Sequence, residues 1–157
     1  MSKQAGPVIV PPGEGPTIEG PVGGPMTYKL RPEQTGGRQT AFEMRIAPGE
    51  GPPLHTHAQE DETFYVLDGR FRFRLGDEVT EARAGSVVFV PVGTQHCFQN
   101  SGDEMARIFV VFSPSGMEGF FDRFAELEEV DPAAFARLGR DVGMEIVGPP
   151  LGESHPL

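Results

Sequence analysis

The sequence predicts an all-β protein, a sandwich or barrel of short strands followed by short C-terminal helices. Between residues 40 and 112, apolar and polar side chains alternate over short segments, as in half-buried strands. Turn-forming residues separate these segments at intervals of roughly ten residues, which is typical of sandwiches and barrels. The 157 residues include 21 glycines and 16 prolines, so long helices cannot fill the chain.

The expected strands are of two kinds. Apolar residues fall at every second position in segments 42–46, 64–66 and 71–75, which predicts strands with one buried face. Segments 87–90 and 108–112 are continuous apolar runs, and such runs predict strands buried on both faces.

The periodicity changes from two to that of a helix after residue 113. One apolar stripe of an amphipathic helix is formed by Met117, Phe120, Phe121, Phe124 and Leu127. Ser115 and Glu118 have the spacing of a capping box for this helix. A second helix is expected from Asp131 and Pro132 to about Gly139, with Asp131 as its N-cap. We expect the phenylalanine stripe to pack against the barrel.

The chain divides into three expected segments: a Pro/Gly-rich arm at 1–39, the β-barrel at 40–113, and helices with a tail at 114–157. The arm is expected to be extended, with residues 8–10 able to add a strand to a sheet edge or to a partner subunit; the alternative is a poorly ordered tail. The Gly- and Pro-rich tail from residue 144 onward is expected to lie over the surface.

Charge and cysteine content exclude several classes of function. The formal net charge is −10, so neither nucleic acid nor an anionic membrane is an expected partner. Cys97 is the only cysteine, which excludes an internal disulfide and a zinc site built from several thiolates. The first ten residues lack the apolar core of a signal peptide, and we expect a cytoplasmic protein.

Three of the four histidines lie in two turn-bounded strand segments. His55 and His57 are two residues apart, so they project to the same side of a strand. A turn at residues 58–61 returns the chain, so that Glu62 meets these imidazoles from the neighbouring strand; His96 follows a Pro-x-Gly turn. Three imidazoles and one carboxylate suit a single divalent ion of Mn, Fe, Co, Ni, Cu or Zn. Two of six octahedral positions stay open for substrate, water or dioxygen.

Other polar residues near these segments have simpler interpretations. Glu60 and Asp61 are expected in the solvated turn, although Glu60 shares the parity of Glu62 and is the alternative ligand if the turn is tighter. Cys97 should point away from the metal as a small buried side chain. Asn100 is expected to stabilise the turn after its strand, and His155 to be solvated.

Segments 49–69 and 85–100 resemble, in residue types and spacing, the two motifs of the cupin superfamily. The resemblance covers a span of about half the chain and implies a jelly-roll barrel, also described as a double-stranded β-helix. It also implies that His55, His57, Glu62 and His96 are the metal ligands. The Pro-rich arm, the stripe around Phe120 and the closing segment at 147–151 are similar to small single-barrel cupins described as quercetin-dioxygenase-like.

The leading functional hypothesis is a metal-dependent dioxygenase that acts on a small oxygen-rich or aromatic molecule, with Glu62 also serving as the catalytic base. Its substrate pocket is expected from the inward-facing Phe42, Met44, Phe64, Val66, Phe73 and Phe98. Simple barrel packing explains these residues equally well. The alternatives are a non-oxidative isomerase, epimerase or decarboxylase and a non-catalytic, metal-dependent binder of small molecules. Arg45, Arg72 and Arg74 should face outward, which disfavours anionic substrates. We expect a homodimer.

Overall fold

The computed structural model describes residues 5–157, and it consists mainly of two antiparallel sheets. The strands are β1 (Thr17–Glu19), β2 (Pro25–Leu30), β3 (Thr40–Ile46), β4 (Pro53–His57), β5 (Asp61–Asp68), β6 (Arg70–Leu75), β7 (Glu78–Arg83), β8 (Val87–Val90), β9 (His96–Asn100), β10 (Ala106–Ser113) and β11 (Met144–Pro150). The helices are α1 (Pro32–Thr35), α2 (Glu118–Ala125), α3 (Pro132–Arg140) and α4 (Leu151–Ser154).

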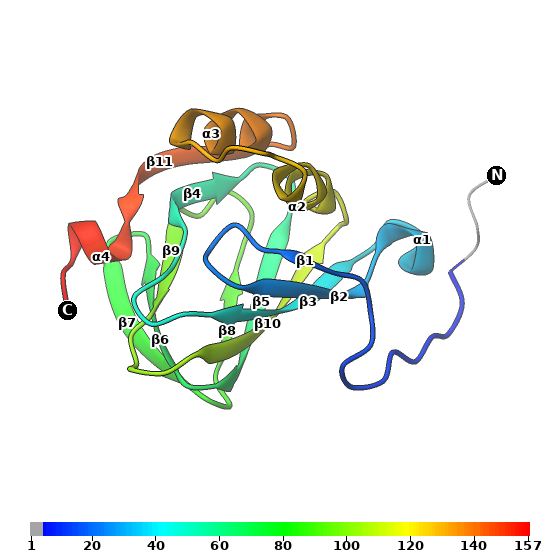
Figure 1. Ribbon diagram of the computed structural model, residues 1–157, viewed down its shortest axis with the longest axis horizontal. Helices are drawn as coiled ribbons and strands as arrows, with labels where there is room; N and C mark the ends of the chain where they lie inside the picture. Colours follow the sequence, from blue (N-terminus) through cyan, green and yellow to red (C-terminus); the bar gives the residue numbers. More distant parts are fainter. Residues whose placement is uncertain (1–4) are drawn as a thin grey trace.

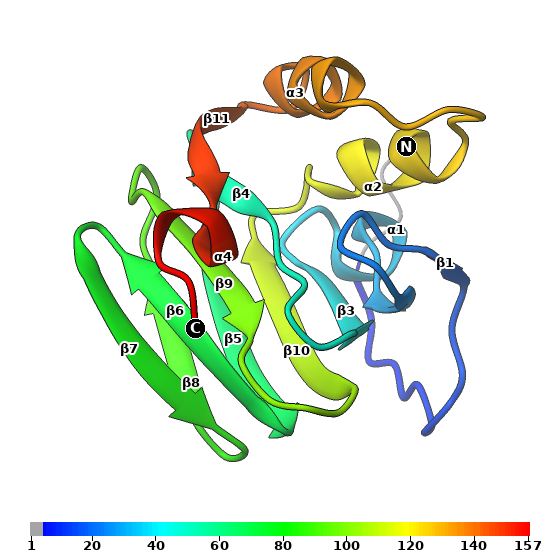
Figure 2. The same cartoon turned by 60° about the vertical axis from the view of Figure 1, so that its left-hand side comes forward.

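The two sheets face each other and enclose one main hydrophobic core (Figures 1 and 2). One sheet has the strand order β1-β2-β3-β10-β5-β8 and the other β11-β4-β9-β6-β7. Strands distant in sequence are neighbours, as β3 and β10 are, which is the arrangement of a jelly roll. The predicted all-β barrel with short C-terminal helices is confirmed.

Alternating side chains create the core. In β10 the even-numbered residues Ala106 to Phe112 are buried, while the odd-numbered residues between them are partly exposed. In β6, Phe71 and Phe73 are buried, whereas the arginines that alternate with them are partly or fully exposed. Because successive strand residues point to opposite faces, this pattern places all the phenylalanines of these strands but Phe109 inside the barrel.

Helices α2 and α3 lie over one end of the barrel in both views (Figures 1 and 2). Phe120, Phe121 and Phe124 of α2 are buried as the stripe predicted, and the Phe120 ring lies 5.0 Å from that of Phe135 in α3. Asp122 ties α2 to the barrel, because it accepts hydrogen bonds from the hydroxyl of Tyr28 in β2, at 2.8 Å, and from the adjacent Arg31 guanidinium.

The second helix begins as predicted, whereas the cap of the first does not form. The Asp131 side chain accepts a hydrogen bond from the Ala134 backbone N–H at 2.7 Å, so Asp131 is the N-cap of α3. The predicted capping box of α2 is wrong, because the Glu118 carboxylate binds the Thr40 hydroxyl and the Gly116 N–H instead. The Ser115 hydroxyl has no partner among the described residues.

Both termini contribute more to the sheets than expected. The arm prediction is wrong for residues 17–30, where β1 and β2 extend the six-stranded sheet next to β3. Residues 8–10 form no strand, and residues 1–4 of the predicted arm lie outside the described residues. The tail lies largely at the surface as expected, but residues 144–150 form β11, which pairs with β4 and continues the second sheet.

Strand β8 is an edge strand whose outer face is not covered. Val87 is 63% exposed and Phe89 is 57% exposed, so the prediction of burial on both faces is wrong for this strand in the single chain. Val88 and Val90 face inward. Within residues 5–157, the helices are too short and too polar to cross a membrane.

Candidate metal centre

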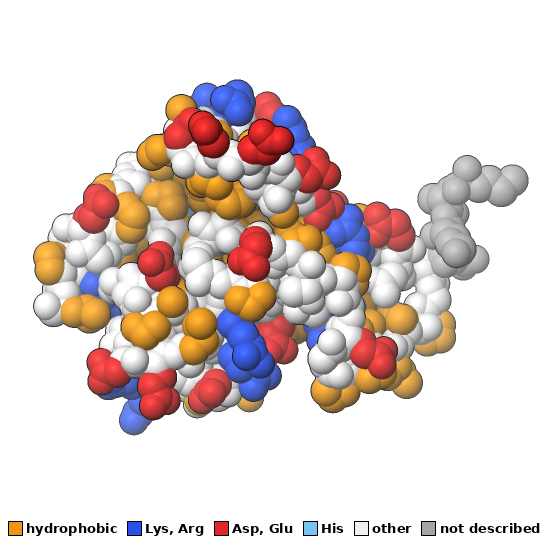
Figure 3. Space-filling view, in the orientation of Figure 1, with side chains coloured by type: hydrophobic (Ala, Val, Ile, Leu, Met, Phe, Trp, Pro, Cys, Tyr) orange, Lys and Arg blue, Asp and Glu red, His pale blue; other side chains and the backbone are white. Residues whose placement is uncertain are grey.

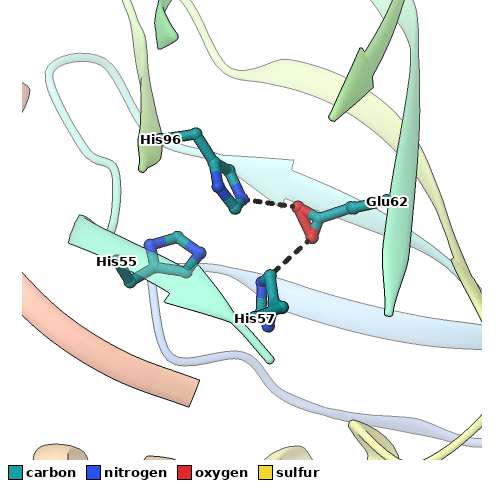
Figure 4. Close-up of side chains that lie close together, drawn as sticks. All are labelled: His55, His57, Glu62 and His96. Atoms are coloured by element: carbon teal, nitrogen blue, oxygen red, sulfur yellow. Dashed lines mark hydrogen bonds and ion pairs between the residues drawn. The ribbon is translucent and has the colours of Figure 1, made fainter. Parts of the chain in front are cut away.

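The structure brings four ligand-type side chains together inside the barrel. His55, His57, Glu62 and His96 each offer one nitrogen or oxygen atom, and these four atoms all lie within 4.8 Å of one another. All four residues are at most 5% exposed. Figure 4 shows the imidazoles of His57 and His96 directed at the Glu62 carboxylate, with His55 beside them.

The two sheets supply the four groups from opposite sides. His55 and His57 lie on β4, and His96 lies opposite His55 in the antiparallel pairing of β4 with β9. Glu62 lies on β5, which belongs to the other sheet. The expectation that Glu62 comes from a strand next to β4 is therefore wrong, and the carboxylate reaches the histidines across the barrel interior.

Backbone carbonyls orient two of the three imidazoles. His55 Nδ1 donates to the Pro53 carbonyl at 2.7 Å, and His96 Nδ1 donates to the Thr94 carbonyl at 2.8 Å. A carbonyl only accepts, so Nδ1 carries the proton, and in the neutral ring Nε2 keeps a lone pair for a metal. His57 differs, because neither of its ring nitrogens has a hydrogen-bond partner among the described residues.

The buried cluster is electrostatically coupled. Burial, together with the nearby His96 and His57, lowers the pKa of His55 to about 3, so this imidazole is neutral at physiological pH. Burial alone would raise the pKa of Glu62, but the neighbouring His57 and His96 outweigh it and lower that pKa to about 2. For His96, the Glu62 carboxylate outweighs burial and raises the pKa.

The four residues fit a divalent transition metal. Glu62 Oε1 lies 3.3 Å from His96 Nε2, and Glu62 Oε2 lies 3.6 Å from His57 Nε2, so the donor atoms already face one point. The buried and unpartnered Nε2 of His57 would gain a partner in the ion. Three nitrogens and one carboxylate would hold Mn, Fe, Co, Ni, Cu or Zn.

Protonation of His55 gives a testable pH dependence for the metal-free protein. Unfolded chains bind a proton at this residue below pH 6.5, whereas the native state does so only near pH 3. The free energy of unfolding therefore falls by about 1.4 kcal/mol per pH unit from this group as the pH drops through that window. Between pH 6.5 and 5.0 we expect urea unfolding to show a loss about 2 kcal/mol larger for the wild type than for His55→Gln. Parallel losses in the two proteins would contradict this assignment.

A small cavity of about 50 Å³ with mainly apolar walls is lined by three of the four clustered residues, His55, His57 and Glu62. Of the six residues expected in the substrate pocket, Phe42, Met44, Phe64 and Phe98 line it. Val66 and Phe73 are buried but do not line this cavity, and the Phe73 ring packs 5.0 Å from that of Phe64.

Several lining residues were missed from the sequence. The ring of Phe112 packs edge-on at 5.0 Å from that of His57, and α2 and α3 close the cavity with Phe121 and Phe135. The alternation of the 108–112 run could have indicated that Phe112 points inward, because it shares the parity of Ile108 and Val110. No Arg or Lys lines the cavity among residues 5–157.

A larger outer cavity of about 390 Å³ lies between the helices and the barrel. Pro21, Pro52 and Phe135 border both cavities, so the inner cavity adjoins the outer cavity at these three residues. Figure 3 shows hydrophobic side chains gathered below α3 on this face of the molecule. A molecule approaching the candidate metal centre from this side therefore meets a mainly apolar surface, with Asp131 and Glu153 also at the outer cavity.

The structure also shows where the other residues near the motifs lie and what they contact. Glu60 is 1% exposed, so its expected place in a solvated turn is wrong, and it is not among the four clustered residues. The Asp61 carboxylate instead accepts from the Val92 N–H at 2.9 Å. Cys97 is fully buried with Leu54 and Leu151. Asn100 bonds the Gly102 N–H and two backbone carbonyls, as a turn-stabilising residue does, and His155 is exposed at the C-terminus.

A jelly-roll barrel that encloses three histidines and one glutamate defines a class of metal-binding barrels. A family model described as the cupin domain matches residues 42–112, and the chain belongs to the cupin family, as its two motifs indicated.

Individual relatives share the barrel region. An uncharacterized protein from Streptomyces coelicolor is 45% identical over 58 residues, which cover 37% of this chain and 53% of the relative. The polyketide synthase CurC from Streptomyces cyaneus is 33% identical over 93 residues, 59% of this chain and 60% of its own. The chain thus spans little more than half the length of these relatives. The crystal structure of a predicted oxalate decarboxylase from Thermotoga maritima superimposes with a TM-score of 0.60 at 24% identity, covering 69% of this chain and all of that one.

Proposed function

We propose that the protein is a metal-dependent dioxygenase that acts on a small oxygen-rich or aromatic organic molecule. The observation that carries the proposal is the buried three-histidine, one-glutamate cluster beside a cavity with almost entirely apolar walls. Apolar walls favour a neutral, flat substrate over an anionic one, since an anion needs a cationic partner.

A bound divalent ion supplies Lewis acidity to a substrate oxygen and, if it is redox-active, a route for electrons to dioxygen. Glu62 is the residue that takes the hydroxyl proton of the substrate, because it is the one carboxylate lining the cavity among the described residues. Phe64, Phe98 and Phe112 exclude water from this proton and orient the substrate ring by packing against its faces.

The cavities and one relative support an aromatic or polycarbonyl substrate. Only a small group fits the inner cavity of about 50 Å³, so the oxygen-bearing edge of the substrate enters it while the remaining skeleton lies in the apolar outer cavity. The relative named as a polyketide synthase is in keeping with such a substrate, because polyketides are carbon skeletons rich in carbonyl and phenol oxygens. The similarity of the arm, of the stripe around Phe120 and of the closing segment to quercetin-dioxygenase-like cupins points in the same direction.

Oxygen consumption tests the proposal directly. Protein loaded separately with Fe²⁺, Mn²⁺, Ni²⁺ or Cu²⁺ is given flavonols or β-diketones in an oxygen electrode, and we expect uptake with at least one metal and substrate. Glu62→Gln should lower the rate by about 10²–10⁴-fold, the usual contribution of a general base. Substrate conversion without oxygen would replace the proposal by a non-oxidative enzyme. A ligand-induced rise in melting temperature without conversion would replace it by a binding protein.

We also propose that the protein is a homodimer that pairs through the outer face of β8 and its neighbours β5 and β10. The middle of this face carries the uncovered residues Val87, Phe89, Tyr65, Thr63, Phe109 and Val111, whereas Asp61 and Arg107 lie at the ends of their strands. None of the six central residues is charged, so two copies of a chain with net charge −10 can approach at the centre of this face without like-charge contact. A second copy would also provide the two-sided burial that the apolar run 87–90 is typical of.

Light scattering after size exclusion should therefore give the mass of two chains. Phe89→Asp places a charge on the apolar face and should give a single-chain mass without loss of fold. Val79→Asp is the matched control, because Val79 is an exposed valine on β7 of the other sheet and its substitution should leave a dimer. A monomeric wild type would contradict the proposal.

A further inference from the structure

Two buried polar groups next to the candidate metal centre lack hydrogen-bond partners among the described residues. One is Nδ1 of His57, and the other is the carboxylate of Glu60, both of whose oxygens are unpartnered. His57 is 3% exposed and Glu60 is 1% exposed, so bulk water does not replace the missing partners. Such groups are rare in native proteins, and two of them within four residues call for a common explanation.

His57 is the only one of the three clustered histidines without an acceptor for Nδ1 in the described structure. His55 and His96 each donate from Nδ1 to the carbonyl of the residue two positions earlier. The Nε2 atom of His57 faces Glu62 at 3.6 Å, so its Nδ1 lies on the ring side turned away from the centre of the cluster (Figure 4). An acceptor on that side would keep the proton on Nδ1 and leave Nε2 free to bind a metal.

Glu60 is the residue placed to provide that acceptor. It lies three positions after His57, in the connection between β4 and β5. Burial raises the pKa of Glu60, and among its charged neighbours His57 has the largest effect and opposes that rise. A Cβ atom at Gly116 would lie 3.2 Å from Glu60 Oε1, so the loop before α2 packs directly on the carboxylate and holds it inside.

We propose that Glu60 positions His57 for the metal by accepting a hydrogen bond from His57 Nδ1, directly or through one buried water. Glu60 is then a positioning residue, because it acts on the metal only through His57. Carboxylates that bind the second nitrogen of a metal-ligating histidine fix the ring orientation and make the ligand more basic. The proposal rests on the proposed function only in that His57 binds a metal.

Two substitutions test this role through metal affinity. Glu60→Leu should weaken Zn²⁺ binding by about 10–100-fold, measured by competition with a chelator, as expected when such a partner is lost. Glu60→Gln should weaken it less, because its amide oxygen still accepts from His57 Nδ1. The metal-free Glu60→Leu protein should meanwhile melt close to the wild type, because the lost hydrogen bond to His57 is offset by the removed cost of burying a carboxylate. A purely structural role of Glu60 would lower melting temperature and affinity together.

The Nδ1–H proton resonance of His57 gives a second readout that needs no metal. In metal-free protein, Glu60→Gln should shift this resonance while the Nδ1–H signals of His55 and His96 stay in place. Glu126→Gln is the control: Glu126 is an exposed carboxylate at the end of α2, so this change should leave the His57 signal and the Zn²⁺ affinity unchanged.

The outcomes separate the two proposals. An unchanged His57 signal in Glu60→Gln, or wild-type Zn²⁺ affinity in Glu60→Leu, would overturn the role of Glu60. If the wild type itself bound no divalent metal, the proposed function would fail, whereas the metal-free resonance would still decide whether Glu60 holds His57. Should Glu60→Leu not fold, the nearly isosteric Glu60→Gln provides both measurements.

Discussion

Replacing His96 with alanine is expected to lower the affinity for a divalent metal by more than about 100-fold, the upper range for the loss of a residue that merely supports a ligand. His96 would supply one of four donors, and its Nδ1 bond to the Thr94 carbonyl at 2.8 Å already aims Nε2 at the cluster. The substitution also removes the closest partner of the buried Glu62 carboxylate, at 3.3 Å. Leaving that carboxylate without this partner should cost the metal-free protein about 3 kcal/mol of stability.

Chelator competition with Co²⁺ or Zn²⁺ measures the affinity, and urea unfolding measures the stability. His155→Ala is the control, because His155 is exposed at the C-terminus and outside the cluster, so both quantities should match the wild type. Wild-type metal affinity in a folded His96→Ala protein would remove His96 from the set of ligands.

The sequence predicted the barrel wherever burial alternated strongly. Segments 42–46 and 71–75 became strands because their apolar residues fall on one face of a pleated chain. Strands β1, β2 and β11 were missed because glycines and prolines flank β1 and β2 and end β11, and pairing with other strands makes these segments strands. Strand propensity is decided largely by neighbours, which a single sequence does not display.

The cluster of four residues could be anticipated from local spacing, because two histidines at alternate positions on a strand must share a face. The position of Glu62 could not be anticipated in this way. Its strand β5 belongs to the other sheet, so the carboxylate reaches the histidines of β4 across the barrel interior. Glu60 was misplaced for a related reason: its burial depends on the loop at Gly116, which is more than fifty residues away along the chain. Local hydrophobic periodicity does not predict contacts between residues that only the topology of the fold brings together.

Phe112 links the barrel core to the candidate metal centre, and its replacement by alanine should have the largest effect on stability. The side chain is 2% exposed, and its ring lies 5.9 Å from that of Phe42 and 5.0 Å from that of His57. Removing a buried phenyl ring costs about 3–5 kcal/mol, because both the burial and the packing around the new cavity are lost. Urea unfolding of the metal-free protein should show this loss.

The same substitution should also weaken metal binding, because Phe112 lies opposite Glu62 in the pairing of β10 with β5 and packs on the His57 ring. A phenyl ring that restricts His57 keeps its Nε2 directed at the cluster, and alanine would leave the imidazole free to turn into the enlarged cavity. Phe112→Leu refills part of that space, so it should recover much of the stability and of the Zn²⁺ affinity together. Val130→Ala, at a residue 61% exposed, is the control and should change stability by less than about 0.5 kcal/mol. If Phe112→Ala lost stability but bound Zn²⁺ as the wild type does, Phe112 would be a core residue alone, and His57 would be held by other contacts.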